Sequence, residues 1–230
     1  MPEATLTRRS SLVRFGGLLA ALAGAGTWKV ATSEGAGPSG VATGAVTCVL
    51  AAELTEGPYY VPGERARRNI TEGRSGTPLQ LQLKVVDAST CRPIKGAAVD
   101  IWHADALGVY SGESVENTVG QTFMRGIQKT NAHGLAVFQT VYPGWYQGRT
   151  VHSHVKVHIA GNVVHTGQLF FHDSLTDRVY RSSPYNRRPN RDTRNATDSI
   201  YRNGGSKSLL TLRKHAVGYV GSIVMGVHRS

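Results

Sequence analysis

The chain has 230 residues, a hydrophobic content of 40% and a formal net charge of +11. This length suits one substantial domain with tails, and many glycines with few aromatic residues favour a soluble all-β protein over a helical bundle. The positive charge alone does not indicate nucleic-acid binding, because no aromatic run interleaves with the arginines and no nucleic-acid-binding motif is visible. We therefore expect no nucleic-acid partner.

The N-terminus has the pattern of an export signal. Arg8 and Arg9 precede an apolar stretch over 15–25, and the small residues in that stretch suit cleavage. The stretch is too short to span a bilayer stably. Paired arginines are typical of the twin-arginine export route, and an ordinary secretory signal is the alternative. We expect residues 1–25 to be a signal peptide, and the exported protein to have no membrane anchor once it is removed.

A linker and one domain follow the signal. Residues 26–46 are rich in Gly, Ala, Ser and Thr, a composition typical of a flexible linker. The domain is expected over 47–230 and contains the two cysteines of the chain, Cys48 and Cys91. In an exported protein such a pair favours a disulfide, with two buried thiols as the alternative.

Short strands separated by turn signals make up the predicted domain. The segment LQLQLKVV over 79–86 alternates apolar and polar residues, as a half-buried strand does. In chain order, the predicted strands are residues 79–86, 97–103, 135–141, 151–159, 168–171, 209–212 and 218–227. Hairpin spacing and weak helix signals predict an all-β fold, an antiparallel β-sandwich whose long loops carry the functional site. No phosphate-binding glycine loop and no Gly-x-Ser-x-Gly nucleophile elbow is present.

Two histidines on one predicted strand are the strongest sign of chemistry. His152 and His154 are two residues apart, a spacing that points both imidazoles to the same face of a strand. Imidazole binds iron, copper, zinc and nickel well. Tyr146 lies just upstream, and Tyr110 in GVYSG adds a second phenol. Two phenolates with two imidazoles favour a trivalent ion such as Fe(III), whereas the pair of histidines alone is also compatible with an exposed strand.

Arginines are concentrated late in the chain, between Arg178 and Arg202. One interpretation is a patch for an acidic partner or a polyanionic surface. The segment is also rich in Asn, Ser and Pro, which favours a solvated, mobile loop. We expect the mobile loop.

Several segments resemble the intradiol ring-cleavage dioxygenases, the family that contains protocatechuate 3,4-dioxygenase and catechol 1,2-dioxygenase. The similarity is greatest to its short, exported, single-domain members. The matching segments are EGPYY (56–60), VDIWHADALGVYSG (99–112), FMRGIQKTNAHGLAVFQTVYPGWYQGRTVHSH (123–154) and GQLFF (167–171). The resemblance implies a non-haem iron enzyme that uses O2 to cleave a catechol between its two hydroxyl-bearing carbons. Muconate-type products are then expected.

The same resemblance assigns the metal ligands. It makes Tyr110 the equatorial tyrosinate and Tyr146 the axial tyrosinate of one Fe(III) per chain. His152 and His154 supply the two imidazoles. No ligand role is expected for four other histidines, His103, His133, His158 and His165.

Four further positions receive roles from the resemblance. Arg149 is expected beside the bound substrate, where its charge would stabilise negative charge on the ring. Gln168 is expected to face the site, although the preceding turn is one residue shorter than in the family pattern. Tyr59 is expected at the pocket mouth, and Trp145 in the pocket wall. Tyr146 has a second expected role, as the base that takes a substrate proton.

Two other functions remain open at this point. The chain could be a non-catalytic secreted β-sandwich that binds a metal or a surface, although the complete ligand set argues against it. It could also be a zinc hydrolase, but tyrosinates are unusual zinc ligands and no general-base carboxylate stands near the histidines in the sequence.

Overall fold

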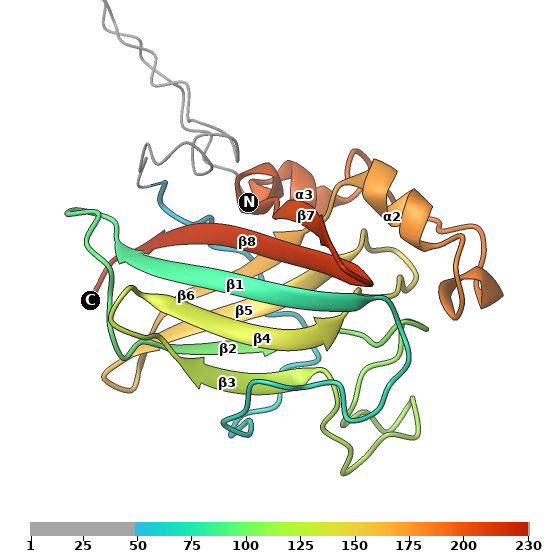
Figure 1. The fold of residues 1–230 in the computed structure, drawn as a ribbon, viewed down its shortest axis with the longest axis horizontal. Helices are drawn as coiled ribbons and strands as arrows, with labels where there is room; N and C mark the ends of the chain where they lie inside the picture. Colours follow the sequence, from blue (N-terminus) through green and yellow to red (C-terminus); the bar gives the residue numbers. More distant parts are fainter. Residues whose placement is uncertain (1–48, 230) are drawn as a thin grey trace, which may run out of the picture. The chain divides into compact units, whose positions relative to one another are not determined.

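The computed structural model describes residues 49–229, which form eight strands in two four-stranded sheets (Figure 1). The strands are β1 (Pro78–Asp87), β2 (Ala98–Trp102), β3 (Arg125–Lys129), β4 (Leu135–Val141), β5 (His152–Ile159), β6 (Asn162–Phe170), β7 (Thr211–His215) and β8 (Gly218–Val227). One sheet has the order β4-β1-β8-β7 and the other the order β3-β2-β5-β6. The predicted all-β sandwich is confirmed.

The predicted strands agree best with the structure where the hydrophobic pattern of the sequence is most regular. β1, β4, β5 and β8 lie at or within a residue of their predicted positions, because each carries regular alternation or a buried apolar run. β6 begins well before its predicted start, and β7 begins later than predicted. β3 was not expected, because its sequence RGIQK holds a single large apolar residue, Ile127.

One strand pair differs from the expected antiparallel arrangement. β1 and β8 pair in parallel, with Leu79 opposite Tyr219 and Asp87 opposite Val227. Parallel strands need a long crossover rather than a tight turn. The chain between β1 and β8 includes almost the whole domain, so it easily supplies that crossover.

The hydrophobic core lies between the two sheets. Side chains on the other face of each sheet therefore point away from the core. Val99 and Ile101 of β2 and Val155 and Val157 of β5 all belong to the core cluster. Because side chains alternate along a strand, the intervening residues of these strands point to the opposite face of the sheet. On β5 these include both histidines of the HxH pair.

The segment before β1 covers this second face. Leu54 N donates to Thr166 O of β6 at 3.0 Å, and Ala66 forms a bridge with Ile127 of β3. The face is therefore buried, although it lies outside the main core. Trp102, Tyr110 and their neighbours form a second apolar cluster there.

The arginine-rich segment is folded against the sheets, so the expected mobile loop is wrong. Between β6 and β7 the chain forms α2 (Asp173–Val179), η1 (Tyr185–Arg187), α3 (Ser199–Arg202) and η2 (Gly205–Ser208). Arg191, with a side chain only 5% exposed, pairs with Asp173 and Asp177 of α2, and Arg194 pairs with Asp177. Ion pairs with these carboxylates hold Arg191 and Arg194 in place, whereas the sequence pattern predicted solvated arginines in a mobile loop.

The predictions for the N-terminal part lie outside the described residues. These are the signal over 1–25, the linker over 26–46 and one partner of the expected disulfide, Cys48. The Cys48–Cys91 disulfide therefore stays a prediction. Over residues 49–229, no helix has both the length and the apolar character needed to cross a membrane.

Candidate metal centre

Three side chains from one stretch of chain meet at a single point. His152 Nε2 lies 3.1 Å from His154 Nε2 and 3.1 Å from the hydroxyl oxygen of Tyr146. The two histidines come from β5, and Tyr146 comes from the loop between β4 and β5. The i, i+2 spacing on a strand brings the imidazoles together, as predicted.

The hydrogen bonds of His152 determine which ring nitrogen faces this point. His152 Nδ1 lies 2.7 Å from the carbonyl oxygen of Thr150. A carbonyl oxygen can only accept, so Nδ1 carries the proton and Nε2 presents a lone pair. Such a fixed tautomer is typical of a histidine that ligates a metal.

His154 contacts an indole ring and lies close to the backbone of the covering segment. Its imidazole stacks on Trp102, with ring centroids 4.8 Å apart and an angle of 5° between the planes. The chain also passes close to this ring at Gly57, where an added Cβ would lie 3.2 Å from His154 Cε1. Gly57 also has a φ of +72°, which glycine adopts without strain.

Tyr110 joins the cluster from the loop between β2 and β3. The residue is 2% exposed, and its ring centroid lies 5.5 Å from that of Tyr146. The Tyr59 ring stacks on it, with the two centroids 4.2 Å apart. The Tyr110 hydroxyl is buried and makes no hydrogen bond of normal geometry among residues 49–229, although the Tyr146 phenol lies close enough to influence it. A buried phenol without a partner is costly, and a cation bound at the centre would supply the partner.

Burial opposes charge on all four side chains. It lowers the pKa of His152 to about 3 and that of His154 well below its usual value. It raises the pKa values of Tyr110 and Tyr146 above the usual 10.0. The imidazoles therefore stay neutral, which is the form that binds a metal, and the phenols need a cation in order to ionise.

The donor set fits a hard, highly charged ion. Among the described residues, no group of three or more His, Cys, Asp or Glu side chains could hold a metal. The candidate site therefore depends on its two tyrosines as much as on its two histidines. Anionic phenolate oxygens with neutral imidazoles suit ferric iron better than they suit zinc.

Arg149 and Gln168 lie next to the two histidines, and their expected roles toward a substrate stay predictions. Arg149 Nη2 donates to Gln168 Oε1 at 2.5 Å, and Arg149 Nη1 lies 3.5 Å from His152 Nε2. Gln168 is fully buried on β6 opposite His154, and its Nε2 donates to Thr55 O at 2.9 Å. The shorter turn before Gln168 has not moved it out of the site.

A carboxylate that was not expected also reaches the site. Asp198 Oδ2 accepts a hydrogen bond from Arg149 Nε at 2.8 Å. Burial tends to raise the pKa of Asp198, but hydrogen bonds from Tyr201, Arg149 and Thr150 outweigh it and lower the pKa. A carboxylate already bound by three N–H groups is a poor general base, so it does not favour a zinc hydrolase.

A buried arginine fixes the loop that carries Tyr110. Arg125 on β3 donates to Ser111 O and to Tyr59 O, each at 2.6 Å. One guanidinium thus holds the backbone of the residue after Tyr110 and the backbone of Tyr59, whose ring stacks on Tyr110. The sequence pattern could not place Arg125 there, because it gave no sign of β3.

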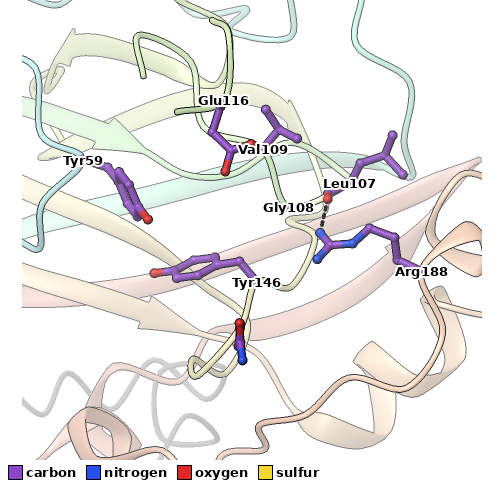
Figure 2. Close-up of a pocket in the computed structure, with 8 residues that line it drawn as sticks. Tyr59, Leu107, Gly108, Val109, Glu116, Tyr146 and Arg188 are labelled. Carbon is purple, nitrogen blue, oxygen red and sulfur yellow. Dashed lines mark hydrogen bonds between the residues drawn. The ribbon is translucent and has the colours of Figure 1, made fainter. Parts of the chain in front are cut away.

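An open cleft of about 530 Å³ adjoins Tyr146 (Figure 2). Its lining residues are Tyr59, Leu107, Gly108, Val109, Glu116, Tyr146, Gln147 and Arg188. Tyr59 and Tyr146 lie toward one end of the cleft and Arg188 lies at the other (Figure 2). Tyr59 thus lines the cleft, and its place at the pocket mouth stays a prediction.

Trp145 has a less direct place than expected. It is not one of the lining residues of this cleft. Its indole lies under the Arg188 guanidinium, 4.5 Å from ring centroid to Cζ, and its Nε1 donates to Arg188 O at 2.9 Å. Trp145 therefore supports the wall that Arg188 forms.

Comparison with known proteins identifies the family. The family model described as Dioxygenase matches residues 55–172. An intradiol ring-cleavage dioxygenase from Tetranychus urticae is 37% identical, with a TM-score of 0.74 over 79% of this chain and 96% of that one. The chain belongs to the intradiol ring-cleavage dioxygenase family. This membership confirms the resemblance that the sequence indicated.

Two further relatives extend the comparison. The dioxygenase domain of a dioxygenase carbohydrate-binding fusion from Streptomyces sp. SirexAA-E is 28% identical, with a TM-score of 0.61 over 79% of this chain and all (100%) of that one. Catechol 1,2-dioxygenase 1 from Acinetobacter lwoffii is 31% identical over 96 residues, which is 40% of this chain. The match spans only 30% of that curated relative.

Proposed function

We propose that this protein binds one ferric ion per chain and uses O2 to cleave catechols between their hydroxyl-bearing carbons, giving muconate-type products. The observation that carries this proposal is the convergence of two imidazoles and two phenols, together with a buried Tyr110 hydroxyl that makes no hydrogen bond within the described part of the chain. Tyr110, Tyr146, His152 and His154 would be the ligands. The family membership supports the same reaction.

The protein and the metal would divide the chemistry between them. Ferric iron, when bound, would draw electron density from a catecholate and so make its ring carbons reactive toward O2. Tyr146 would accept a proton from a catechol hydroxyl, because a phenolate is a strong base whose unperturbed pKa is about 10. Arg149 would stabilise negative charge on the ring through its fixed guanidinium, and Gln168 would hold that guanidinium in place.

A turnover screen tests the proposal. Purified protein should contain about one iron per chain and absorb visible light, because tyrosinate bound to Fe(III) is coloured. It should consume O2 with at least one of catechol, protocatechuate, hydroxyquinol or a caffeate-like catechol. A colourless protein would favour a zinc enzyme, and a coloured protein that leaves every catechol intact would favour a metal-binding module.

Replacing Tyr146 with phenylalanine tests the proposed base. We expect Tyr146→Phe to keep most of its iron, since three ligands remain, but to deprotonate bound catechol slowly. Stopped-flow absorbance after mixing with catechol in the absence of O2 measures that step. Tyr180→Phe is the matched control, because it removes a phenol that bonds to Pro143 O outside the ligand set. An unchanged rate in Tyr146→Phe would rule out the base role.

We also propose that the protein is exported by the twin-arginine route and acts outside the cytoplasm. Arg8, Arg9 and the apolar stretch over 15–25 support this proposal. N-terminal sequencing of the mature protein from an extracytoplasmic fraction tests it.

A further inference from the structure

The segment between β6 and β7, residues 171–210, is the C-terminal segment, and its Asp198 carboxylate contacts the candidate active site. This side chain is 1% exposed and lies at the N-terminus of α3. Its Oδ1 accepts from Tyr201 N at 2.8 Å, and its Oδ2 accepts from Arg149 Nε at 2.8 Å and from Thr150 N at 2.9 Å. Both oxygens are used, and two of the three donors come from the stretch that carries the metal ligands.

These contacts determine the direction of the Arg149 guanidinium. The group is planar and rigid, so two anchored nitrogens fix its plane. Asp198 holds Nε and Gln168 holds Nη2, which leaves Nη1 3.5 Å from His152 Nε2. Without Asp198, the guanidinium would be free to turn about its single remaining anchor.

The same carboxylate steadies the backbone beside a metal ligand. Asp198 accepts from Thr150 N, and Thr150 O is the partner of His152 Nδ1 at 2.7 Å. Thr150 Oγ1 also donates to Asn195 Oδ1 at 2.6 Å. Residues of the C-terminal segment thus fix the peptide that connects Arg149 to His152.

We propose that Asp198 is a positioning residue of the dioxygenase, acting through Arg149. This inference rests on the proposed function. Asp198 transfers no proton, because it accepts hydrogen bonds from three N–H groups that occupy both of its oxygens. Its negative charge aims the guanidinium at the substrate position, and a misplacement of about 1 Å in such a group can cost roughly a factor of 10² in rate.

Removing the charge while keeping the shape is the first test. Asp198→Asn retains one acceptor oxygen, but its NH2 group must replace the other oxygen and face an N–H donor, either that of Tyr201 or those of Arg149 and Thr150. We expect iron content near that of the wild type and a kcat lower by about 10- to 100-fold. Asp198→Ser is the second variant, because serine remains a good helix N-cap but cannot reach Arg149 as the carboxylate does. Asp177→Asn is the matched control, since it loses ion pairs with Arg191 and Arg194 in the same segment.

A double variant separates positioning from general stability. Lysine has no group equivalent to Nε of arginine, so in an Arg149→Lys background the Asp198→Asn change should lower kcat by clearly less than it does in the wild-type background, and the remaining loss reports the contact with Thr150 N. Additive losses in the double variant would show that Asp198 does not act through Arg149. Equal losses in Asp198→Asn and Asp177→Asn would also overturn the proposal.

A binding measurement keeps this inference distinct from the proposed function. Titration with 4-nitrocatechol in the absence of O2, followed by absorbance, reports the fit of a catechol beside Arg149 without turnover. We expect weaker binding in Asp198→Asn and wild-type binding in Asp177→Asn. If the wild type cleaved no catechol, the proposed function would fail while this binding difference could still be observed. If the wild type turned over and Asp198→Asn matched it in kcat and binding, only the positioning role would fail.

Discussion

Replacing His152 with alanine is expected to remove iron and ring-cleavage activity together. His152 Nε2 lies 3.1 Å from both His154 Nε2 and the Tyr146 hydroxyl, so its loss takes away a central donor. Loss of an outer partner of a metal ligand already costs about 10- to 100-fold in affinity, and loss of the ligand itself should cost more. Metal analysis of the purified variant and its visible absorbance measure the effect, with O2 uptake as the activity assay.

A second histidine on the same strand provides the control for this prediction. His158 lies on β5 four residues after His154, on the same face, and its Nε2 has no partner among residues 49–229. His158→Ala therefore makes the same chemical change without touching the candidate centre, and should keep the iron. Iron and colour retained in His152→Ala would disprove the ligand assignment.

The sequence predicted those strands that have a regular local pattern of apolar and polar residues. Alternation in LQLQLKVV marked β1, and the i, i+2 histidines marked the side of β5 that faces the candidate centre. β3 was missed because a five-residue strand with one large apolar residue has no readable period. Parallel pairing of β1 with β8 depends on the path of the whole chain, which no local pattern encodes.

Some residues of the candidate site could likewise be recognised from the sequence, and others only from the structure. Tyr146, Arg149, His152 and His154 lie within nine residues of one another, so their spacing and types could be recognised together. Asp198 and Arg188 come from a segment whose charge suggested solvent, and only tertiary contacts show that they are paired or packed. Asp198 does carry a local signal, since aspartate is a favoured N-cap, but that signal predicts α3 and not the contact with Arg149.

Replacing Arg149 with alanine is expected to preserve iron and colour but to remove most ring-cleavage activity. A guanidinium stays protonated and offers no lone pair to a metal, so Arg149 is not a ligand. Loss of one preorganised group that stabilises developing charge typically costs about 2.7–4 kcal/mol, a factor of roughly 10² to 10³ in rate. Parallel measurement of iron content and kcat separates this outcome from loss of the metal.

Arg149→Ala also loses the ion pair with Asp198, which should lower the stability of the fold. This loss of stability has to be separated from the loss of catalytic activity. Breaking a buried pair can cost about 3–5 kcal/mol, although Asp198 would keep its bonds from Thr150 N and Tyr201 N. Arg191→Ala is the matched control, because Arg191 has a side chain 5% exposed and is paired with two aspartates that are not in the candidate site. We expect both variants to melt earlier than the wild type but only Arg149→Ala to lose turnover. Arg149→Lys should recover activity in part, because a point charge replaces a planar fork. Turnover by Arg149→Ala at the wild-type rate would refute the proposed arrangement of substrate and guanidinium, even with iron present.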